Sequence, residues 1–335
     1  MSQLIPREKL FGNPERVGLQ ISPDGETLAW IAPKDDVLNV WMAPLESPDK
    51  ATPVTDDRHR GIRFYTWSKA GDAILYFQDR DGDENWQMFR VTVADRQEAN
   101  LTPYKEITTR LHGLSWDFPN TAVVGLNDRD KSWHDVYAID LQTGERSLLF
   151  ENDGGFGNFH VDRQLNLRLA ERSLEEGGRQ IFRFTSESPE LEESEYIRVP
   201  HEDDLTTGIA GFTGDGDDFY WLSSLTGDKA GLFLRNFDSG GDTVIGRHDK
   251  ANVSQLLVHP TTFRVEAYGA NHIQLEWAVV DESVAADFDF LQSELSGELQ
   301  IVSRSAQDDL WIVNRGVAEA PNTNYLYRKH EKKIV

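Results

Sequence analysis

A recurring turn is the feature that most constrains how this chain can fold. Residues 19–30 read as strand, Pro-Asp-Gly turn and strand, and residues 64–76 repeat that order. The two turn glycines, Gly25 and Gly71, lie 46 positions apart (71 minus 25). Weaker copies follow at residues 115–123, 159–167, 211–220, 257–265 and 302–311. The resulting step of roughly 44 to 52 residues is the spacing of four-stranded propeller blades.

A strand-like segment with aromatic and aliphatic residues recurs later in six of the repeats, at residues 41–43, 88–91, 136–139, 181–184, 232–234 and 325–327. The pattern predicts an all-β fold: a seven-bladed β-propeller of four-stranded antiparallel blades, starting near residues 17, 63, 111, 157, 208, 255 and 300. A β-sandwich pair remains the alternative, although a sandwich gives no reason for one turn to recur along the whole chain.

Two expectations concern the order of strands within the ring. The first strand of each blade should line the centre, with one marker residue per blade packed between neighbours: Ile21, Trp67, Leu114, Val161, Phe212, Val258 and Val302. The last blade is expected to lack its outer strand, because few residues remain after position 306. Residues 324–335 should then be the least protected from hydrogen exchange, unless residues 1–16 pack on the ring and close it.

Composition narrows the possible partners. The 57 acidic side chains against 34 basic ones give a formal charge of −23, which repels nucleic acid and anionic membrane surfaces. The chain has no cysteine, so disulfides, thiolate zinc sites and cysteine nucleophiles are excluded. The first ten residues contain Arg7, Glu8 and Lys9 and no apolar stretch, from which we expect a soluble, cytoplasmic protein.

Three stretches resemble one family of enzymes. They are residues 5–14 with the turn 21–25, residues 79–86 with Phe89 and Arg90, and residues 127–130 with 134–137. In these places the chain resembles bacterial serine peptidases of the prolyl oligopeptidase family, in the acylaminoacyl-peptidase and dipeptidyl-aminopeptidase branch. The resemblance implies a single propeller domain over residues 1–335, followed by a catalytic α/β-hydrolase domain after residue 335. Its expected partners are that domain and short peptides.

The chain alone is expected to have no catalytic residues. An α/β-hydrolase nucleophile needs the Gly-x-Ser-x-Gly turn, and the nearest sequence, at residues 113–117, ends in Asp117 instead of glycine. No histidine pair has metal-ligand spacing with a third ligand, and the acidic residues 79–83 lack the glycine of a calcium loop. The glycines at 154–157 precede no helix, so no nucleotide loop is predicted. We therefore predict no metal and no cofactor.

Two loops are candidates for contact with a peptide. The first contains Asp79, Asp81, Asp83, Glu84, Asn85 and Trp86, and the second contains Asp128, Arg129, Asp130 and His134. Carboxylates beside an indole can hold an ammonium group by charge and by cation–π attraction. The function implied by the resemblance is that of a non-catalytic propeller that gates an attached peptidase. A free-standing interaction propeller of the Tol type, or a metal-dependent propeller lactonase or lyase, is the alternative.

Overall fold

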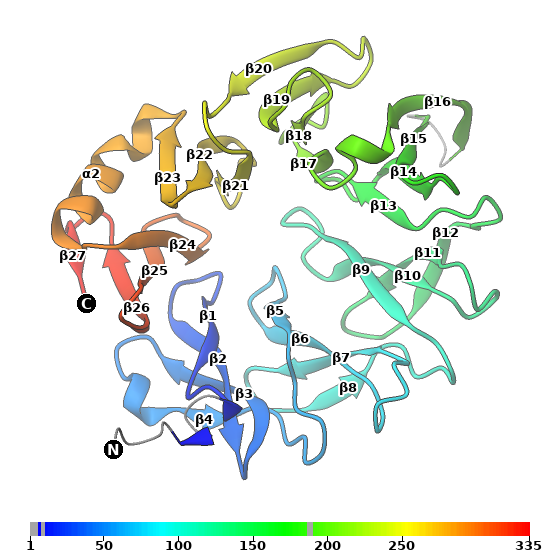
Figure 1. Cartoon of the computed structure of the whole chain (residues 1–335). Helices are drawn as coiled ribbons and strands as arrows, with labels where there is room; N and C mark the ends of the chain where they lie inside the picture. The colour runs from blue at the N-terminus through cyan, green and yellow to red at the C-terminus, as the bar shows by residue number, and fades with distance from the viewer. Residues whose placement is uncertain (1–5, 8–10, 186–189) are drawn as a thin grey trace.

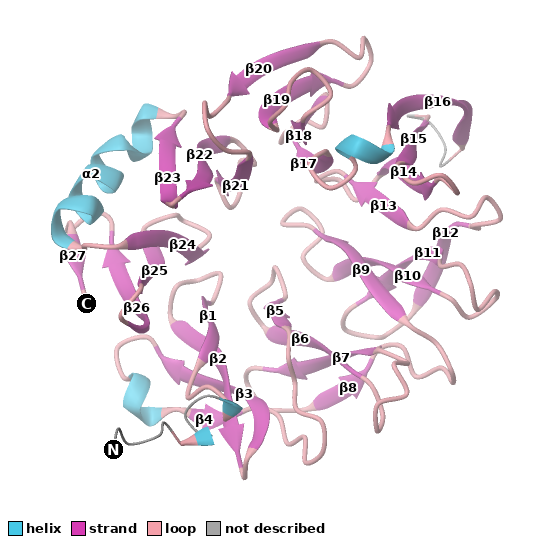
Figure 2. Cartoon of the chain, viewed as in Figure 1, coloured by secondary structure: helices cyan, strands magenta, loops and turns pink. Residues whose placement is uncertain are grey.

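The computed structural model describes residues 6–7, 11–185 and 190–335. These residues form seven antiparallel sheets, each built from consecutive strands and arranged as blades around one axis (Figure 1). Figure 2 shows that strands and connecting loops make up most of the ring, with helix α2 (Ala285–Glu294) at its edge. The predicted seven-bladed β-propeller is therefore confirmed.

The blades have the following strands, in chain order. Blade 1 has β1 (Val17–Ile21), β2 (Thr27–Lys34), β3 (Val37–Pro44) and β4 (Thr52–Pro53). Blade 2 has β5 (Tyr65–Trp67), β6 (Ala73–Gln78), β7 (Gln87–Thr92) and β8 (Glu98–Asn100). Blade 3 has β9 (Thr109–Leu114), β10 (Thr121–Leu126), β11 (Asp135–Asp140) and β12 (Arg146–Phe150). Blade 4 has β13 (Asn158–Val161), β14 (Leu167–Ser173), β15 (Arg179–Phe184) and β16 (Leu191–Val199).

The remaining three blades follow the same order. Blade 5 has β17 (Gly208–Phe212), β18 (Asp218–Ser223), β19 (Gly231–Asn236) and β20 (Asp242–Gly246). Blade 6 has β21 (Val253–Val258), β22 (Val265–His272) and β23 (Gln274–Val279). Blade 7 has β24 (Glu298–Arg304), β25 (Leu310–Val317), β26 (Ala320–Arg328) and β27 (Lys333–Ile334). Short 3-10 helices lie at Pro48–Lys50, His201–Asp203 and Glu282–Val284.

The second strands explain why the blades pack as a ring. Ala122, Val123 and Val124 of β10 are all fully buried, although successive side chains point to opposite faces of the sheet. Both faces of blade 3 are therefore covered, by blade 2 on one side and blade 4 on the other. A strand covered on both faces has a continuous apolar sequence instead of an alternating one, and the hydrophobic core is divided among the interfaces between blades.

The recurring turn has a local physical cause. Ser22 is buried, and its hydroxyl accepts a hydrogen bond from the Thr27 amide at 2.9 Å and contacts Asp24 at 2.5 Å. Gly25 takes φ +78°, a conformation that side chains rarely adopt, and its amide donates to the Ser22 carbonyl at 2.9 Å. Ser68 and Gly71 make similar contacts in blade 2, so a hydroxyl and a glycine close both of these turns.

The antiparallel order of strands gives the ring two faces. The loops between first and second strands, such as residues 22–26, lie on what we call the turn face. Loops between second and third strands, and loops that join successive blades, lie on the opposite side, which we call the terminal face. The name reflects the two ends of the chain: β1 starts at the terminal face, and β27 runs toward it.

The prediction that the seventh blade lacks its outer strand is wrong. β27 pairs with β26 through Tyr327 with Ile334 and Arg328 with Lys333, and Val335 exchanges two further backbone hydrogen bonds with Leu326. The outer strand is only two residues long, Lys333 and Ile334, which is too short to show a strand pattern in the sequence. The expected weak protection of residues 324–335 rested on an unpaired edge, and that edge is paired from Leu326 onward.

Blade 6 is instead the sheet with three strands. After β23 the chain forms α2. Its residues Phe288 and Leu291, together with the preceding Val284, are buried against the interface of blades 6 and 7. The Phe288 ring lies 5.7 Å from Trp277 of β23 and 6.5 Å from Trp311 of β25. The helix thus buries apolar side chains in the place where the other blades continue with a fourth strand.

The first strands lie nearest the axis, as predicted (Figure 1). Of the seven marker residues, Ile21, Trp67 and Phe212 are buried, whereas Leu114, Val161 and Val258 are only partly buried. The prediction is wrong for Val302, which is 44% exposed on β24. Side chains of several first strands, including Arg110 and Asn158, are also exposed, so solvent reaches the centre of the ring.

The ring closes between blades 1 and 7 without a shared sheet. The amide of Ile21 donates to the Ser303 hydroxyl at 3.0 Å, and Ile21 packs in one apolar cluster with Leu310 and Ile312 of blade 7. A groove of about 1070 Å³ runs along this seam and is lined by both ends of the described chain, including Val335. Half of residues 1–16, namely 1–5 and 8–10, lie outside the described part; of the others, Asn13 donates to the Asp36 carbonyl at 3.0 Å and Arg16 lies 5.2 Å from the Trp30 ring centre, both in blade 1.

Candidate functional site

The loop of residues 79–86 joins β6 to β7 on the terminal face, and its first carboxylate is structural. Asp79 has a fully buried side chain, with Arg60 Nη2 at 3.4 Å from its Oδ2 atom. The Glu84 amide donates to the same oxygen at 3.3 Å. A buried carboxylate paired with a guanidinium fixes the two ends of the loop relative to each other. Asp79 is therefore not available to a ligand.

The tip of the same loop presents three exposed carboxylates, those of Asp81, Asp83 and Glu84. Asp81 and Glu84 take positive φ values of 54° and 59°, so the backbone turns sharply at both residues. Asp83 accepts hydrogen bonds from the amides of Arg80 at 3.2 Å and Asn85 at 3.0 Å. The side-chain and backbone hydrogen bonds from Asn85 hold the pKa of Asp83 below its usual range, so the tip is anionic at neutral pH.

The second predicted loop, residues 127–134 between β10 and β11, is largely committed to internal contacts. Arg129 forms a two-pronged pair with Asp135, with both nitrogen–oxygen distances at 2.8 Å. Asp128 lies 2.7 Å from Arg146 Nη1. His134 is buried, and burial lowers its pKa to about 4, so its ring is neutral at pH 7. Asp130 has the one exposed carboxylate among the four predicted residues. Asp128 is partly buried and paired with Arg146, and Arg129 is exposed but paired with Asp135.

The structure brings these two loops together through a residue that the sequence did not single out. The Thr108 hydroxyl donates to the Glu84 carbonyl at 3.1 Å, and the Thr108 amide donates to Asn127 Oδ1 at 2.6 Å. The Lys131 ammonium adds a hydrogen bond to the Glu106 carbonyl at 2.6 Å. The strand-joining segment 101–108 therefore links both loops into one surface across blades 2 and 3, with the exposed carboxylates concentrated in the first loop. No sequence signal marks Thr108, because the link arises only when the two blades pack.

Trp86 closes the first loop at its junction with β7. Its side chain is partly buried, and its carbonyl accepts a hydrogen bond from the Thr109 amide at 2.7 Å. This hydrogen bond fixes the backbone at the end of the loop to the start of blade 3. An aromatic ring and exposed carboxylates in one loop can bind a cation by two means at once.

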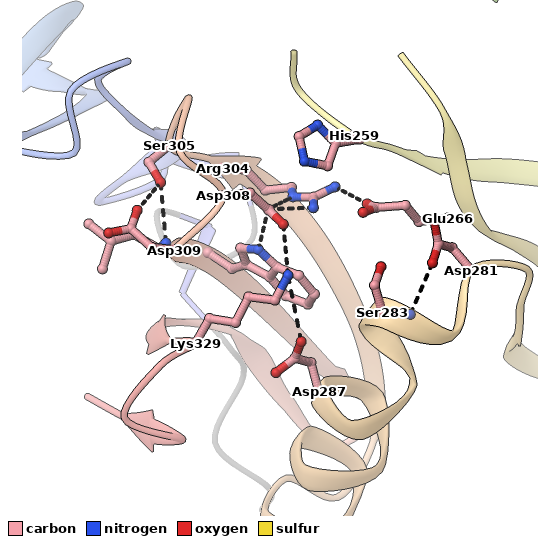
Figure 3. Close-up of polar contacts among 12 residues, drawn as sticks. His259, Glu266, Asp281, Ser283, Asp287, Arg304, Ser305, Asp308, Asp309 and Lys329 are labelled. Atoms are coloured by element: carbon pink, nitrogen blue, oxygen red, sulfur yellow. Dashed lines mark hydrogen bonds and ion pairs between the residues drawn. The ribbon is translucent and has the colours of Figure 1, made fainter. Parts of the chain in front are cut away.

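A buried charge cluster between blades 6 and 7 was missed by the sequence (Figure 3). His259, Glu266 and Asp308 each offer a ligand atom, and these atoms lie within 4.8 Å of one another, which is a metal-like arrangement. Arg304 nevertheless donates to Glu266 Oε2 at 2.5 Å and also to Asp308. Lys329 Nζ lies 2.8 Å from the second Asp308 oxygen. Two cationic side chains thus neutralise these carboxylates, and the cluster joins neighbouring blades.

Ser115, the serine nearest to a nucleophile motif in the sequence, has a structural role. It is fully buried, and its hydroxyl donates to the Arg163 carbonyl at 2.5 Å. The amide of Asp117 donates to the same hydroxyl at 3.0 Å. The side chain therefore closes the first turn of blade 3, as Ser22 does in blade 1.

The chain is similar in sequence to two known peptidases. The chain is 39% identical to dipeptidyl aminopeptidase BIII of Pseudoxanthomonas mexicana over 326 residues, which is 97% of this chain and 47% of that protein. The match therefore covers nearly all of this propeller and less than half of that peptidase. This confirms the predicted resemblance to the prolyl oligopeptidase family. Dipeptidyl peptidase family member 6 of Caenorhabditis elegans matches at 27% identity over 98% of this chain and 46% of its own length.

The chain spans about half the length of the curated relatives it matches. A solved prolyl endopeptidase structure superposes with a TM-score of 0.66, covering 96% of this chain and 49% of its own, at 10% identity. That likeness shows a shared fold. No family model matches the chain. Among the described residues, helices that are long and apolar enough to cross a bilayer are absent.

Proposed function

We propose that this chain is the propeller of a serine peptidase and that it restricts an attached α/β-hydrolase domain to short peptides. The observation that carries the proposal is the 39% identity to a dipeptidyl aminopeptidase across 97% of this chain but only 47% of that enzyme. A ring of tightly packed blades beside an active site excludes folded proteins by size. In this proposal the catalytic residues lie in a separate peptidase domain, which corresponds to the part of dipeptidyl aminopeptidase BIII that this chain does not match.

The terminal face is the docking surface in this proposal. Large apolar side chains are exposed on its loops around the ring: Phe64 at 55%, Leu205 at 97% and Ile273 at 88%. In this proposal the attached domain would cover these groups and remove their apolar surface from water. Because β27 runs toward this face, a domain continuing from Val335 would be delivered to it. The linked loops of blades 2 and 3 lie on the same face, where they would border the space between the two domains.

Within that space, the loop tip would hold the amino end of the peptide. Asp81, Asp83 and Glu84 supply exposed negative charge, and the partly buried Trp86 supplies an aromatic ring at the end of the same loop. A charge-assisted hydrogen bond to an ammonium group is stronger than a neutral one, so the loop would favour substrates with a free amino end over blocked ones. Asp79 is left out of this role because Arg60 already pairs with it.

The test compares two substrates in a protein that carries its peptidase domain. Glu84→Gln and Asp81→Asn should each lower kcat/KM by roughly tenfold for a peptide with a free amino end, the equivalent of one charged hydrogen bond. The N-acylated form of the same peptide should be cleaved as before. Asp228→Asn, at an exposed residue on the terminal face of blade 5, is the matched control. Unchanged kcat/KM on both substrates would remove this loop from the active site.

A further inference from the structure

The loops of the turn face are connected from blade to blade. The amide of Ala306 in blade 7 donates to the Pro23 carbonyl in blade 1 at 2.9 Å. Blades 3 and 4 are joined by the hydrogen bond from Ser115 to Arg163 described above. Such contacts between neighbours are expected wherever first strands converge on the axis of a propeller.

Two further hydrogen bonds on this face join blades that are not neighbours. The indole Nε1 of Trp116, in blade 3, donates to the Pro260 carbonyl, in blade 6, at 2.7 Å. Blades 4 and 5 separate these blades on one side of the ring, and blades 7, 1 and 2 separate them on the other (Figure 1). A direct bond between them therefore crosses the centre of the ring.

Arg163 of blade 4 makes the second connection. Its Nη1 atom donates to the Thr261 carbonyl of blade 6 at 3.0 Å. The guanidinium carbon lies 5.7 Å from the centre of the Phe263 phenyl ring, also in blade 6. The other nitrogens grip Asp117 of blade 3 at 2.7 and 2.8 Å, a two-pronged geometry that fixes the orientation of the guanidinium. One arginine thus ties three blades together.

Lys69 adds blade 2 to the same assembly. Its ammonium lies 4.6 Å from the centre of the Trp116 ring, within the range of a cation–π contact. Burial lowers the pKa of Lys69, which indicates that water is largely excluded around this group. The indole of Trp116 is therefore held from both sides, by a lysine on its face and by a carbonyl at its edge.

The terminal face has no comparable connection. Over residues 6–7, 11–185 and 190–335, the hydrogen bonds on that face join residues of one blade or of adjacent blades. The centre of the ring therefore differs at its two faces. Hydrogen bonds cross it at the turn face, whereas at the terminal face the surrounding loops of the described chain are bonded only to adjacent blades.

We propose that Trp116, Asp117, Arg163 and the loop of residues 259–263 form a latch that keeps the turn-face opening of the ring closed, so that peptides reach its centre from the terminal face. The closure is a property of the ring alone. The statement about peptides rests on the proposed function. The two parts are therefore tested separately.

The closure is tested in this chain, which has no cysteine to interfere with labelling. Nitroxide labels at Phe118→Cys and Thr262→Cys, which are exposed positions on the facing loops, report the distance across the latch by pulsed electron paramagnetic resonance. We expect one narrow distance distribution, which Trp116→Phe combined with Arg163→Gln broadens. Trp41→Phe is the control, because it removes an indole hydrogen bond of 3.1 Å within blade 1. A broad distribution in the unaltered latch, or a narrow one in the double variant, would overturn the closure.

The route of the peptide is tested in a protein that carries its peptidase domain. A short bifunctional maleimide across the same two cysteines locks the latch covalently. If peptides enter from the terminal face, the lock changes kcat/KM for a short peptide by less than about twofold. A large loss on cross-linking, absent when each single-cysteine variant is treated with the reagent, would show that peptides pass the latch. That result would refute the route while leaving the peptidase assignment intact, whereas absence of hydrolysis before cross-linking would count against the proposed function.

Discussion

Removing the Arg304 side chain should destabilise the propeller strongly, because it leaves buried negative charge behind. Arg304, Glu266 and Asp308 have side chains only 6%, 3% and 7% exposed. In Arg304→Met, Asp308 keeps Lys329 at 2.8 Å, but Glu266 loses the cation that was 2.5 Å away. Breaking a buried ion pair from one side costs about 3–5 kcal/mol, so we expect a loss of that size in the free energy of unfolding.

A second variant separates this effect from lost packing. Glu266→Gln in the Arg304→Met background removes the stranded charge, so the double variant should be more stable than Arg304→Met alone. Urea unfolding at neutral pH, followed by tryptophan emission, reports on both, since the Arg304 guanidinium lies 4.9 Å from the Trp311 ring. A loss below about 1 kcal/mol in Arg304→Met, or losses that simply add in the double variant, would refute the reasoning.

Two further predictions concern stability. The pKa of His134 is about 4 in the fold against 6.5 for a free side chain, so its contribution is complete above pH 6.5 and is lost as the pH falls toward 4. At a pH about one unit below 6.5 this loss is about 1.4 kcal/mol, and His134→Gln should reduce the fall in Tm between neutral and mildly acidic buffer; an unchanged fall would contradict the assignment. A Cβ at Gly113 would overlap Val161 Cγ2, so Gly113→Ala should cost about 1–3 kcal/mol in urea unfolding. Gly157→Ala, which meets nothing within 4 Å, is its control, and equal losses in both would argue against the clash.

The parts of the fold that the sequence predicted are those with local causes. A hydroxyl at Ser22 and a glycine at Gly25 shape the first turn by contacts within six residues, so the turn has a signature that can be recognised in the sequence. β27 has no such signature, because two residues paired to β26 have too little pattern to recognise. Helix α2 was missed although its buried Phe288 and Leu291 have helical spacing, because the acidic Asp287 is buried beside them and interrupts the apolar pattern.

The sequence predicted only part of the candidate site, because the organisation of that site depends on contacts between blades and not on local contacts. In the sequence Asp79 and Asp81 look alike, yet Arg60 buries one of them and leaves the other in solvent. The cluster around Arg304 draws Glu266 from the neighbouring blade, 38 positions away. Such pairs cannot be read from a repeat, because the period shows which positions are equivalent and not which side chains meet.

The seam between blades 1 and 7 has a consequence for how the chain could be rearranged. Each sheet is completed by consecutive strands, and both ends of the described chain line one groove. A circular permutant that joins these ends with a linker and opens the loop at residues 200–207, between blades 4 and 5, would keep the strand pairing of every sheet. The position of the seam therefore decides not whether the ring forms, but at which point of its circumference any attached domain is tethered.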